Sequence, residues 1–365
     1  MVSVLCVSAY KTRVTRLTLK ALSTHSSSTV KFFSSTNQSL ARRDTGLDIT
    51  GQATYPREVP GPKGVPSRAE QIRRLSSSSP SDPYDILVIG GGATGAGVAF
   101  DAASRDGNLK VACIERGDFS SETSSRSTKL IWAGIRYMAT AAASLLSRKL
   151  LTNPIDTMKD FAGEIRMVLN CHKERRYMTE KQSHLTNWVP IAMPFTKLHI
   201  SPAPFNHPLF GFFPVLAPFI LKIYDSMSGF TCPPSYVMGK AKSKEAFPQL
   251  AERDIKFCSV FYEAQHNDAR TNIAIALSAA EYGAHISNYV EMVDVIRGED
   301  GKTVIGVKAL DRMSNEEFAV YSKKVVFAGG PFTDLLRGME EKDESNLKPA
   351  VTGASGTHVI LPGVS

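Results

Sequence analysis

The sequence lacks the residue spacings that are typical of metal centres. Its five cysteines include no C-x-x-C pair, and its eight histidines include no H-x-x-x-H pair. Such spacings place two ligands on the same side of a turn or helix, as zinc and iron sites require. One of the cysteines, Cys113, lies inside an apolar run. The sequence therefore predicts no metal site, and its cysteine pattern is typical of a reducing compartment.

No uninterrupted apolar run is long enough to cross a membrane as a helix. The nearest approach is residues 198–221, which contain no Asp, Glu, Lys or Arg but include five prolines. Proline breaks a helix that lipid surrounds, because its ring removes a backbone hydrogen bond. Two interpretations of this segment stay open, namely a shallow contact with a membrane surface and burial against a substrate domain.

Acidic residues are absent from the first 43 positions, which hold seven of the 43 Lys and Arg residues. The rest of the chain therefore carries 36 basic and 35 acidic side chains, a balance that argues against a nucleic-acid-binding face. An acid-free, Ser- and Thr-rich start predicts an organellar transit peptide over residues 1–43, with a disordered cytosolic tail as the alternative. Several prolines and a run of serines then predict a flexible linker over residues 44–83.

A nucleotide-binding unit follows the predicted linker. Residues 86–89 form an apolar run that is typical of a buried parallel strand. The sequence G-x-G-x-x-G then follows at Gly90, Gly92 and Gly95, and a helix of small residues comes after it. These glycines allow a tight turn, a close approach of a pyrophosphate to the backbone, and close packing of the helix against the strand.

A second strand and an acidic residue complete the unit. Residues 111–114 predict the strand, and Glu115 at its end can accept hydrogen bonds from a ribose but would repel a 2′-phosphate. FAD and NAD therefore both stay open, whereas NADP is disfavoured. Later in the chain, a helix and three strands continue the α/β pattern, and the last strand runs into a pair of glycines. We expect these elements at residues 272–282, 285–295, 304–310 and 324–328, with the glycines at 329 and 330.

Further motifs make the chain resemble one known family. They are T-S-S-R-S-T-K-L-I with G-I-R-Y over residues 123–137, D-A-R at 268–270, A-G-G-P at 328–331 and G-T-H-V-I-L-P at 356–362. Together with the glycine turn, they resemble the FAD-dependent glycerol-3-phosphate dehydrogenases, which are mitochondrial or bacterial membrane flavoenzymes. The resemblance covers about residues 84–365 and favours FAD over NAD. It implies an α/β, amino-acid-oxidase-like flavoprotein fold, in which a Rossmann-like FAD-binding domain is interleaved with a substrate or cap domain at about 150–260.

The resemblance also implies a set of cofactor-binding residues. The glycine turn would cradle the FAD pyrophosphate, and the acidic residue after the second strand would hold the adenosine ribose. Small hydroxyl residues of the following loop would line the path to the flavin, because they can hydrogen-bond an anion without excluding it sterically. The implied residues are Gly90, Gly92, Gly95, Glu115, Thr123, Ser124, Ser127, Thr128, Lys129, Leu130, Val290, Ala328, Gly329 and Gly330.

The implied activity is the oxidation of sn-glycerol 3-phosphate to dihydroxyacetone phosphate at the inner mitochondrial membrane. A hydride would pass from C2 to the flavin N5, and ubiquinone would accept the electrons. Such a site needs a fixed cation for the phosphate and a base for the C2 hydroxyl. Arg136 matches a substrate arginine of the family, Tyr137 is a candidate donor to the substrate, and His358 matches a histidine suited to proton transfer.

Two departures from the family pattern bear on this activity. The family usually continues K-L-I with His-Gly-Gly, whereas this chain has Trp132, Ala133 and Gly134, and an indole at this point could stack on the flavin or obstruct it. The chain also ends roughly where family members continue into a long second portion, so we expect this polypeptide alone to bind FAD poorly. An amine or hydroxy-acid oxidase of the same fold and a non-catalytic truncated product stay open as alternative functions.

Overall fold

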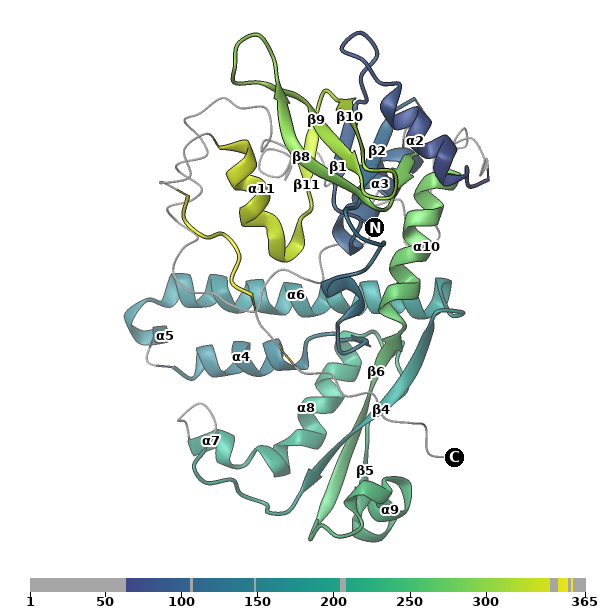
Figure 1. Cartoon of the computed structure of the whole chain (residues 1–365). Coiled ribbons are helices and arrows are strands. Elements are labelled where there is room, and N and C mark those ends of the chain that lie inside the picture. The colour runs from purple at the N-terminus through teal and green to yellow at the C-terminus, as the bar shows by residue number, and fades with distance from the viewer. Residues whose placement is uncertain are drawn as a thin grey trace. The chain divides into compact units, whose positions relative to one another are not determined.

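The computed structural model describes residues 64–105, 108–147, 149–203, 208–341, 347–353 and 356. The described chain divides into two compact units, whose elements are labelled in Figure 1. Unit 1 combines the residues up to Ser127 with those from Asp268 onward, and unit 2 is the segment Thr128–Asn267 between them. Unit 2 is therefore inserted into unit 1, as the family resemblance implies for a cap domain. It is longer than the expected cap segment at about 150–260. The predicted transit peptide and His358 lie outside the described residues.

A parallel sheet of four strands forms the centre of unit 1, with the strand order β11-β1-β2-β7. Apolar side chains on both faces of β1 and β2 are buried, which explains why these two strands have continuous apolar sequences. The predicted strands at 86–89 and 111–114 are confirmed residue for residue. The strands are β1 (Ile86–Ile89), β2 (Val111–Ile114), β7 (His285–Ser287) and β11 (Val325–Phe327).

Different elements cover the two faces of this sheet. Val88 and Cys113 face α3 and α10, whose alanines allow the two helices to approach closely. Leu87 and Ile114 face the antiparallel sheet β10-β9-β8 together with α2 (Arg68–Ser76) and α11. The predicted helix at 272–282 begins earlier than expected, and the predicted strand at 285–295 is divided into β7 and β8. The covering elements are α3 (Ala93–Arg105), α10 (Asp268–Glu281), α11 (Thr333–Glu340), β8 (Val290–Arg297), β9 (Val304–Asp311) and β10 (Glu316–Tyr321).

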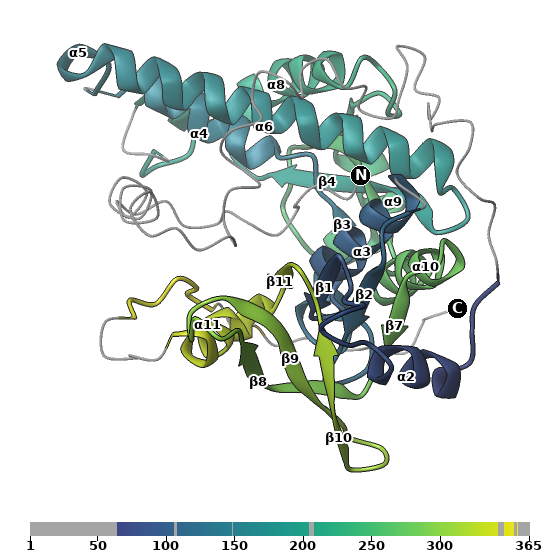
Figure 2. The ribbon, with the colours of Figure 1, turned by 90° about the horizontal axis from the view of Figure 1, so that it is seen from above.

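Helix α2 (Arg68–Ser76) corrects the linker prediction, because it lies inside the segment that we expected to be flexible. It runs beside β7, as Figure 2 shows from above. Leu75 is fully buried in the core of unit 1. The Oε1 atom of Gln71 accepts a hydrogen bond of 3.2 Å from the backbone N–H of Ile286 in β7. The helix thus covers the edge strand of the described parallel sheet and satisfies one of its backbone donors.

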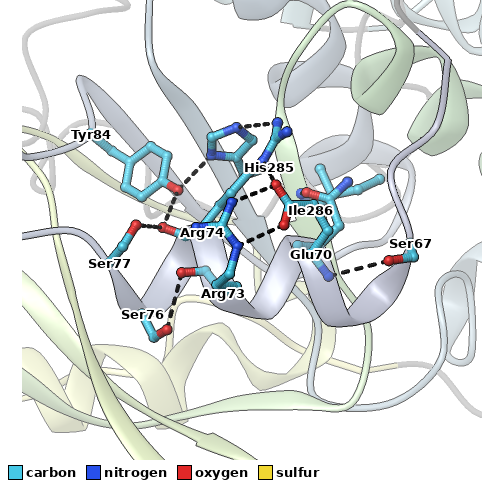
Figure 3. A network of polar contacts seen from close by, with 10 residues as sticks. Ser67, Glu70, Arg73, Arg74, Ser76, Ser77, Tyr84, His285 and Ile286 are labelled. Carbon is cyan, nitrogen blue, oxygen red and sulfur yellow. Dashed lines mark hydrogen bonds and ion pairs between the residues drawn. The ribbon is translucent and has the colours of Figure 1, made fainter.

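A polar network also ties α2 to β7 (Figure 3). The hydroxyl of Tyr84 donates to the carbonyl oxygen of Arg74 at 3.1 Å and lies 2.6 Å from Nδ1 of His285. The guanidinium of Arg74 lies 3.2 Å from Nε2 of the same imidazole. Because a guanidinium can only donate, Nε2 is the acceptor and Nδ1 carries the proton. Burial, and then the charge of Arg74, lower the pKa of His285 to about 4.

We expect the free energy of unfolding to fall as the pH is lowered from about 6.5 toward 4. In the unfolded chain the His285 imidazole titrates near its ordinary pKa of 6.5, whereas in the folded chain its pKa is about 4. The unfolded state therefore binds more protons within this window, and stability that is complete above pH 6.5 is lost below it. Buried His172 shifts in the same direction. Urea titrations from pH 7 to 4.5 should show a shallower pH dependence for His285→Gln, and identical slopes would contradict the assignment.

Unit 2 is built on a long antiparallel pair of strands, β4 and β6, which β3 and β5 extend. The helices α4 and α6 lie side by side in both Figure 1 and Figure 2. The strands are β3 (Leu130–Ile131), β4 (Thr186–Phe195), β5 (Tyr236–Gly239) and β6 (Phe257–His266). The helices are α4 (Ile135–Leu145), α5 (Lys149–Thr152), α6 (Pro154–Lys181), α7 (Pro208–Gly211), α8 (Phe213–Met227) and α9 (Lys240–Ala246).

The proline-rich segment 198–221 contains α7 and the first part of α8. Among the described residues, none of the helices has the length and apolar character needed to cross a membrane. One side of α8 is buried in the core of unit 2 through Leu221 and Tyr224. The other side exposes Val215, Phe219 and Ile223, which recur every four residues. Burial within unit 2 therefore explains the apolar residues on only one side of α8, and those on its other side are exposed.

Candidate nucleotide-binding and active site

The turn between β1 and α3 forms the base of the candidate site in unit 1. Gly90 has a φ of +112°, and a Cβ atom there would lie 2.5 Å from the carbonyl oxygen of Ala328. A Cβ atom on Gly95, within α3, would lie 1.8 Å from the carbonyl oxygen of Gly90. Neither position accepts a side chain without movement of the backbone. Close approaches of this kind are what a dinucleotide-binding turn requires.

The N-terminus of α3 meets a hydroxyl of the Ser/Thr loop. The Oγ atom of Ser124 accepts a hydrogen bond of 2.9 Å from the backbone N–H of Ala93. A Cβ atom on Gly92 would lie 3.0 Å from the same oxygen. The first N–H groups of a helix attract anions, and Ser124 Oγ takes the acceptor position that a phosphate oxygen takes at such a terminus. Because a hydroxyl can also donate, this loop suits a phosphate.

Glu115 lies at the carboxyl end of β2, beside the glycine turn. Its Oε2 atom accepts a hydrogen bond of 2.6 Å from the N–H of Gly91, and Oε1 accepts one of 2.8 Å from the N–H of Gly117. Each carboxylate oxygen keeps a second lone pair, to which a ribose hydroxyl can donate. The backbone N–H of buried Val290 donates to the carbonyl oxygen of Glu115 at 2.8 Å. The predicted adenosine-side residues therefore lie together.

The end of β11 lies against the same turn. The N–H of Ala328 donates to the carbonyl oxygen of Ile89 at 2.8 Å. The chain then continues through Gly329 into a 3₁₀ turn, η4 (Gly330–Phe332). The guanidinium carbon of Arg116 lies 3.8 Å from the centre of the Phe332 ring. This second close approach brings the predicted residues at 328–330 to the carboxyl edge of the sheet, where ligands of open α/β sheets bind.

The predicted cofactor residues of the Ser/Thr loop divide between the two units. Lys129 has a φ of +62°, and its carbonyl oxygen accepts a hydrogen bond of 2.9 Å from the N–H of His266. Leu130 pairs with Gln265 between β3 and β6. Thr123, Ser124 and Ser127 belong to unit 1, whereas Thr128, Lys129 and Leu130 belong to unit 2.

Trp132 and Ala133, the departures from the family pattern, pack within unit 2. The centre of the indole of Trp132 lies 6.3 Å from that of the Phe261 ring in an edge-on arrangement. Ala133 is fully buried, and its N–H donates to Oε2 of Glu263 at 3.1 Å. The methyl group of Ala133 therefore packs in the core of unit 2, and the indole of Trp132 contacts the ring of Phe261 in the same unit.

Helix α4 carries the two predicted substrate residues on its first turn. Arg136 is exposed, whereas Tyr137 is half-buried and packs against the core of unit 2. The N–H of Tyr137 donates to the carbonyl oxygen of Gly134 at 2.9 Å. The positive end of the helix dipole adds to the charge of the guanidinium. Arg136 is therefore suited to binding an anion such as a phosphate.

A buried ion pair, which sequence reasoning missed, supports this turn. Glu263 and Arg175 are 0% and 1% exposed, and their side chains lie 2.5 Å apart. The hydroxyl of Tyr224 donates to Oε1 of Glu263 at 2.5 Å, and the guanidinium of Arg175 lies 2.9 Å from Nδ1 of His172. Burial raises the pKa of the Glu263 carboxyl, and the charge of Arg175 opposes that rise. The one feature of the sequence that could have indicated this ion pair is the acidic residue Glu263 inside the largely apolar strand β6.

The fold of unit 1 and its glycine turn define a class, namely the dinucleotide-binding flavoproteins with an amino-acid-oxidase-like fold. The family described as "FAD dependent oxidoreductase" matches residues 85–365. The chain belongs to this family.

Several relatives carry a more specific name. The chain is 38% identical over 327 residues to "Glycerol-3-phosphate dehydrogenase, mitochondrial" of Macaca fascicularis, which covers 88% of this chain and 40% of the relative. It is 39% identical over 303 residues to the human protein of the same name, covering 82% of this chain and 37% of the relative. The chain thus spans about two fifths of the length of these relatives.

A solved structure is similar as well. The glycerol-3-phosphate dehydrogenase of Bacillus halodurans, complexed with FAD, aligns with a TM-score of 0.50 and 26% sequence identity. The alignment covers 75% of this chain and 38% of the bacterial chain. This likeness agrees with the FAD-binding fold that the sequence predicted.

The residues at the carboxyl edge of the unit 1 sheet fit FAD. The backbone around Gly90 and Gly95 leaves no room for side chains, so that a pyrophosphate can approach it. The N-terminus of α3 and the hydroxyl of Ser124 suit its phosphates. The remaining lone pairs of the Glu115 carboxylate suit a ribose. These residues would hold the nucleotide half of the cofactor.

Proposed function

We propose that this chain contributes to a glycerol-3-phosphate dehydrogenase, which oxidises sn-glycerol 3-phosphate to dihydroxyacetone phosphate and passes the electrons to ubiquinone. The observation that carries the proposal is the exposed guanidinium of Arg136 on the first turn of α4, directly after the loop that follows the dinucleotide cradle. A phosphorylated substrate needs such a cation, whereas a simple amine does not, and the carboxylate of a hydroxy acid is distinguished from a phosphate by the substrate assay below. The names of the relatives support the same substrate.

Each proposed substrate residue has a separate task. FAD, when bound, supplies the acceptor for the hydride that leaves C2. Arg136 would bind the phosphate through two parallel N–H groups and so hold the substrate, with its C2, in one orientation relative to the protein. Tyr137 would donate a hydrogen bond to the substrate, and His358 would take the proton of the C2 hydroxyl.

We also propose a mitochondrial location at the inner membrane. The relatives are named mitochondrial, and the acid-free residues 1–43 have the composition of a transit peptide. The exposed apolar side of α8, with Val215, Phe219 and Ile223, supports a shallow membrane contact. Flotation of the protein with liposomes tests this contact, because Phe219→Glu should release the protein if α8 lies in the lipid interface.

Arg136→Ala is expected to lower kcat/KM for glycerol 3-phosphate by about 100-fold, chiefly through KM. The variant loses charge-assisted hydrogen bonds worth about 3 kcal/mol in the enzyme–substrate complex. The measurement is substrate-dependent dye reduction with excess FAD. Arg166→Ala, which removes an exposed arginine from α6 of the same unit, is the matched control and should behave as the wild type.

The same assay separates the alternative functions. A dehydrogenase reduces the dye without releasing hydrogen peroxide, whereas an amine or hydroxy-acid oxidase releases peroxide with a different substrate. Bound FAD that no substrate reduces would indicate a non-catalytic product. An unchanged KM in Arg136→Ala would remove the main support for a phosphorylated substrate.

A further inference from the structure

Helix α10 contacts both loops of the candidate dinucleotide site in unit 1. Asp268 begins the helix, and Asn272 follows four residues later, so both side chains lie on the same side of α10. They are 5% and 2% exposed. Asp268 is the first residue of the D-A-R motif that belongs to the family resemblance.

Asn272 holds the glycine turn. Its Nδ2 atom donates a hydrogen bond of 2.9 Å to the carbonyl oxygen of Gly91. The N–H of Gly91 donates in turn to Oε2 of Glu115 at 2.6 Å. The backbone of Gly91 is therefore fixed from two elements at the point where a pyrophosphate would approach, and its order does not depend on the glycine-rich sequence alone.

Asp268 holds the Ser/Thr loop. Its Oδ2 atom accepts hydrogen bonds from the backbone N–H and the hydroxyl of Ser127, at 3.1 and 2.7 Å. Its Oδ1 atom accepts from the N–H of Ala269 at 2.8 Å. These donors offset the negative charge of the carboxylate, which would otherwise repel a phosphate nearby. The same loop supplies Ser124, which meets the N-terminus of α3.

The side-chain oxygen of Asn272, Oδ1, is buried but has no hydrogen-bond partner among the described residues. Rotating the side-chain amide of Asn272 by half a turn would not give Oδ1 a partner, because Oδ1 would then face the carbonyl oxygen of Gly91, which is also an acceptor. Buried polar atoms in folded proteins nearly always have partners. An unpaired acceptor beside the glycine turn is free to receive a hydrogen bond from an O–H or N–H donor that arrives with a ligand or a water.

We propose that Asp268 and Asn272 form a clamp that orders the glycine turn and the Ser/Thr loop before FAD binds. In the bound state, Oδ1 of Asn272 receives a hydrogen bond from a hydroxyl of FAD or from a water that FAD holds. Both are positioning residues for the loops, and Asn272 is in addition a binding residue. The clamp rests on FAD binding, which the family establishes, and is independent of the substrate.

Hydrogen exchange in the unliganded chain tests the clamp directly. We expect Asp268→Ala to speed exchange of the Ser127 amide at least tenfold, and Asn272→Ala to do the same for the Gly91 amide. Asn170→Ala, at an exposed position of helix α6, is the matched control and should change neither amide. Exchange at Ser127 and Gly91 that stays within twofold of the wild type would overturn the proposal. This measurement needs no bound FAD.

FAD titration by flavin fluorescence tests the binding role. Asn272→Asp keeps the acceptor and the size of the side chain but loses the donor to Gly91 and adds a negative charge, so it is expected to fold and to raise the Kd at least tenfold. In Asn272→Ala, both the clamp and the acceptor are lost, and the Kd should also rise at least tenfold. A wild-type Kd in either variant would contradict the binding role, whatever the activity toward glycerol 3-phosphate.

Discussion

Gly95→Ala is expected to destabilise unit 1 by about 3 kcal/mol or more and to abolish FAD binding. The added Cβ atom would lie 1.8 Å from the carbonyl oxygen and 2.9 Å from the carbonyl carbon of Gly90. Both are backbone atoms of the turn itself, so the clash cannot be relieved by rotating a side chain. Helix α3 would have to move away from β1, which would open the phosphate end of the site. Urea unfolding and FAD titration measure the two effects.

Gly163→Ala is the matched control, because Gly163 also lies in a helix. A Cβ atom there would have nothing within 4 Å. Alanine stabilises a helix relative to glycine by about 0.5–1 kcal/mol. The two Gly→Ala changes should therefore alter the unfolding free energy in opposite directions. Equal effects would show that the close approach of α3 to the glycine turn is not what Gly95 provides.

Glu263→Ala is expected to destabilise unit 2 by about 3–5 kcal/mol. The change leaves the charge of Arg175 buried without its partner. It also removes the acceptor for the hydroxyl of Tyr224 and for the backbone N–H of Ala133. Because Ala133 lies in the turn before α4, the first turn of that helix, with Arg136, should lose order as well. Thermal unfolding measures the stability, and hydrogen exchange at Ala133 measures the order of the turn.

Two further variants separate the buried charge from other causes. Glu263→Leu combined with Arg175→Met replaces both charges by apolar groups and should recover the part of the lost stability that is due to the unpaired charge, whereas the Tyr224 hydroxyl and the Ala133 N–H still lack their acceptor. Asp254→Ala breaks the exposed pair with Lys240 and should alter stability by less than about 1 kcal/mol. If Glu263→Ala were no more damaging than Asp254→Ala, the buried pair would not be what supports the turn.

The sequence predicted best those parts of the fold that depend on residues close together in the chain. The strands β1 and β2 were predicted exactly, because burial on both faces requires a continuous apolar run. The glycine turn was predicted because its tight geometry restricts the sequence at neighbouring positions. The predicted strand at 285–295 is instead interrupted at Tyr289, which has a φ of +53°. A tyrosine gives no sequence signal of such a turn.

The parts that sequence missed depend on partners far away in the chain. Helix α2 is held by contacts such as that of Arg68 with Asp311, 243 residues later. The ion pair of Arg175 with Glu263 spans 88 residues, and the contact of Asn272 with Gly91 spans 181. No local pattern specifies which of many polar residues will meet after folding. For this reason the sequence supplied loop residues of the candidate site and most of helix α10, but not the contacts of Asp268 and Asn272 that hold those loops.

The most direct test of the proposed function is whether glycerol 3-phosphate reduces the flavin bound to this protein. The purified chain, supplied with excess FAD, is mixed anaerobically with glycerol 3-phosphate, glycerol, a hydroxy acid or an amino acid. The account predicts that only glycerol 3-phosphate bleaches the absorbance of the bound flavin and that Arg136→Ala requires far more of it. Bleaching by an amino acid or a hydroxy acid, or bound flavin that glycerol 3-phosphate leaves oxidised, would contradict it.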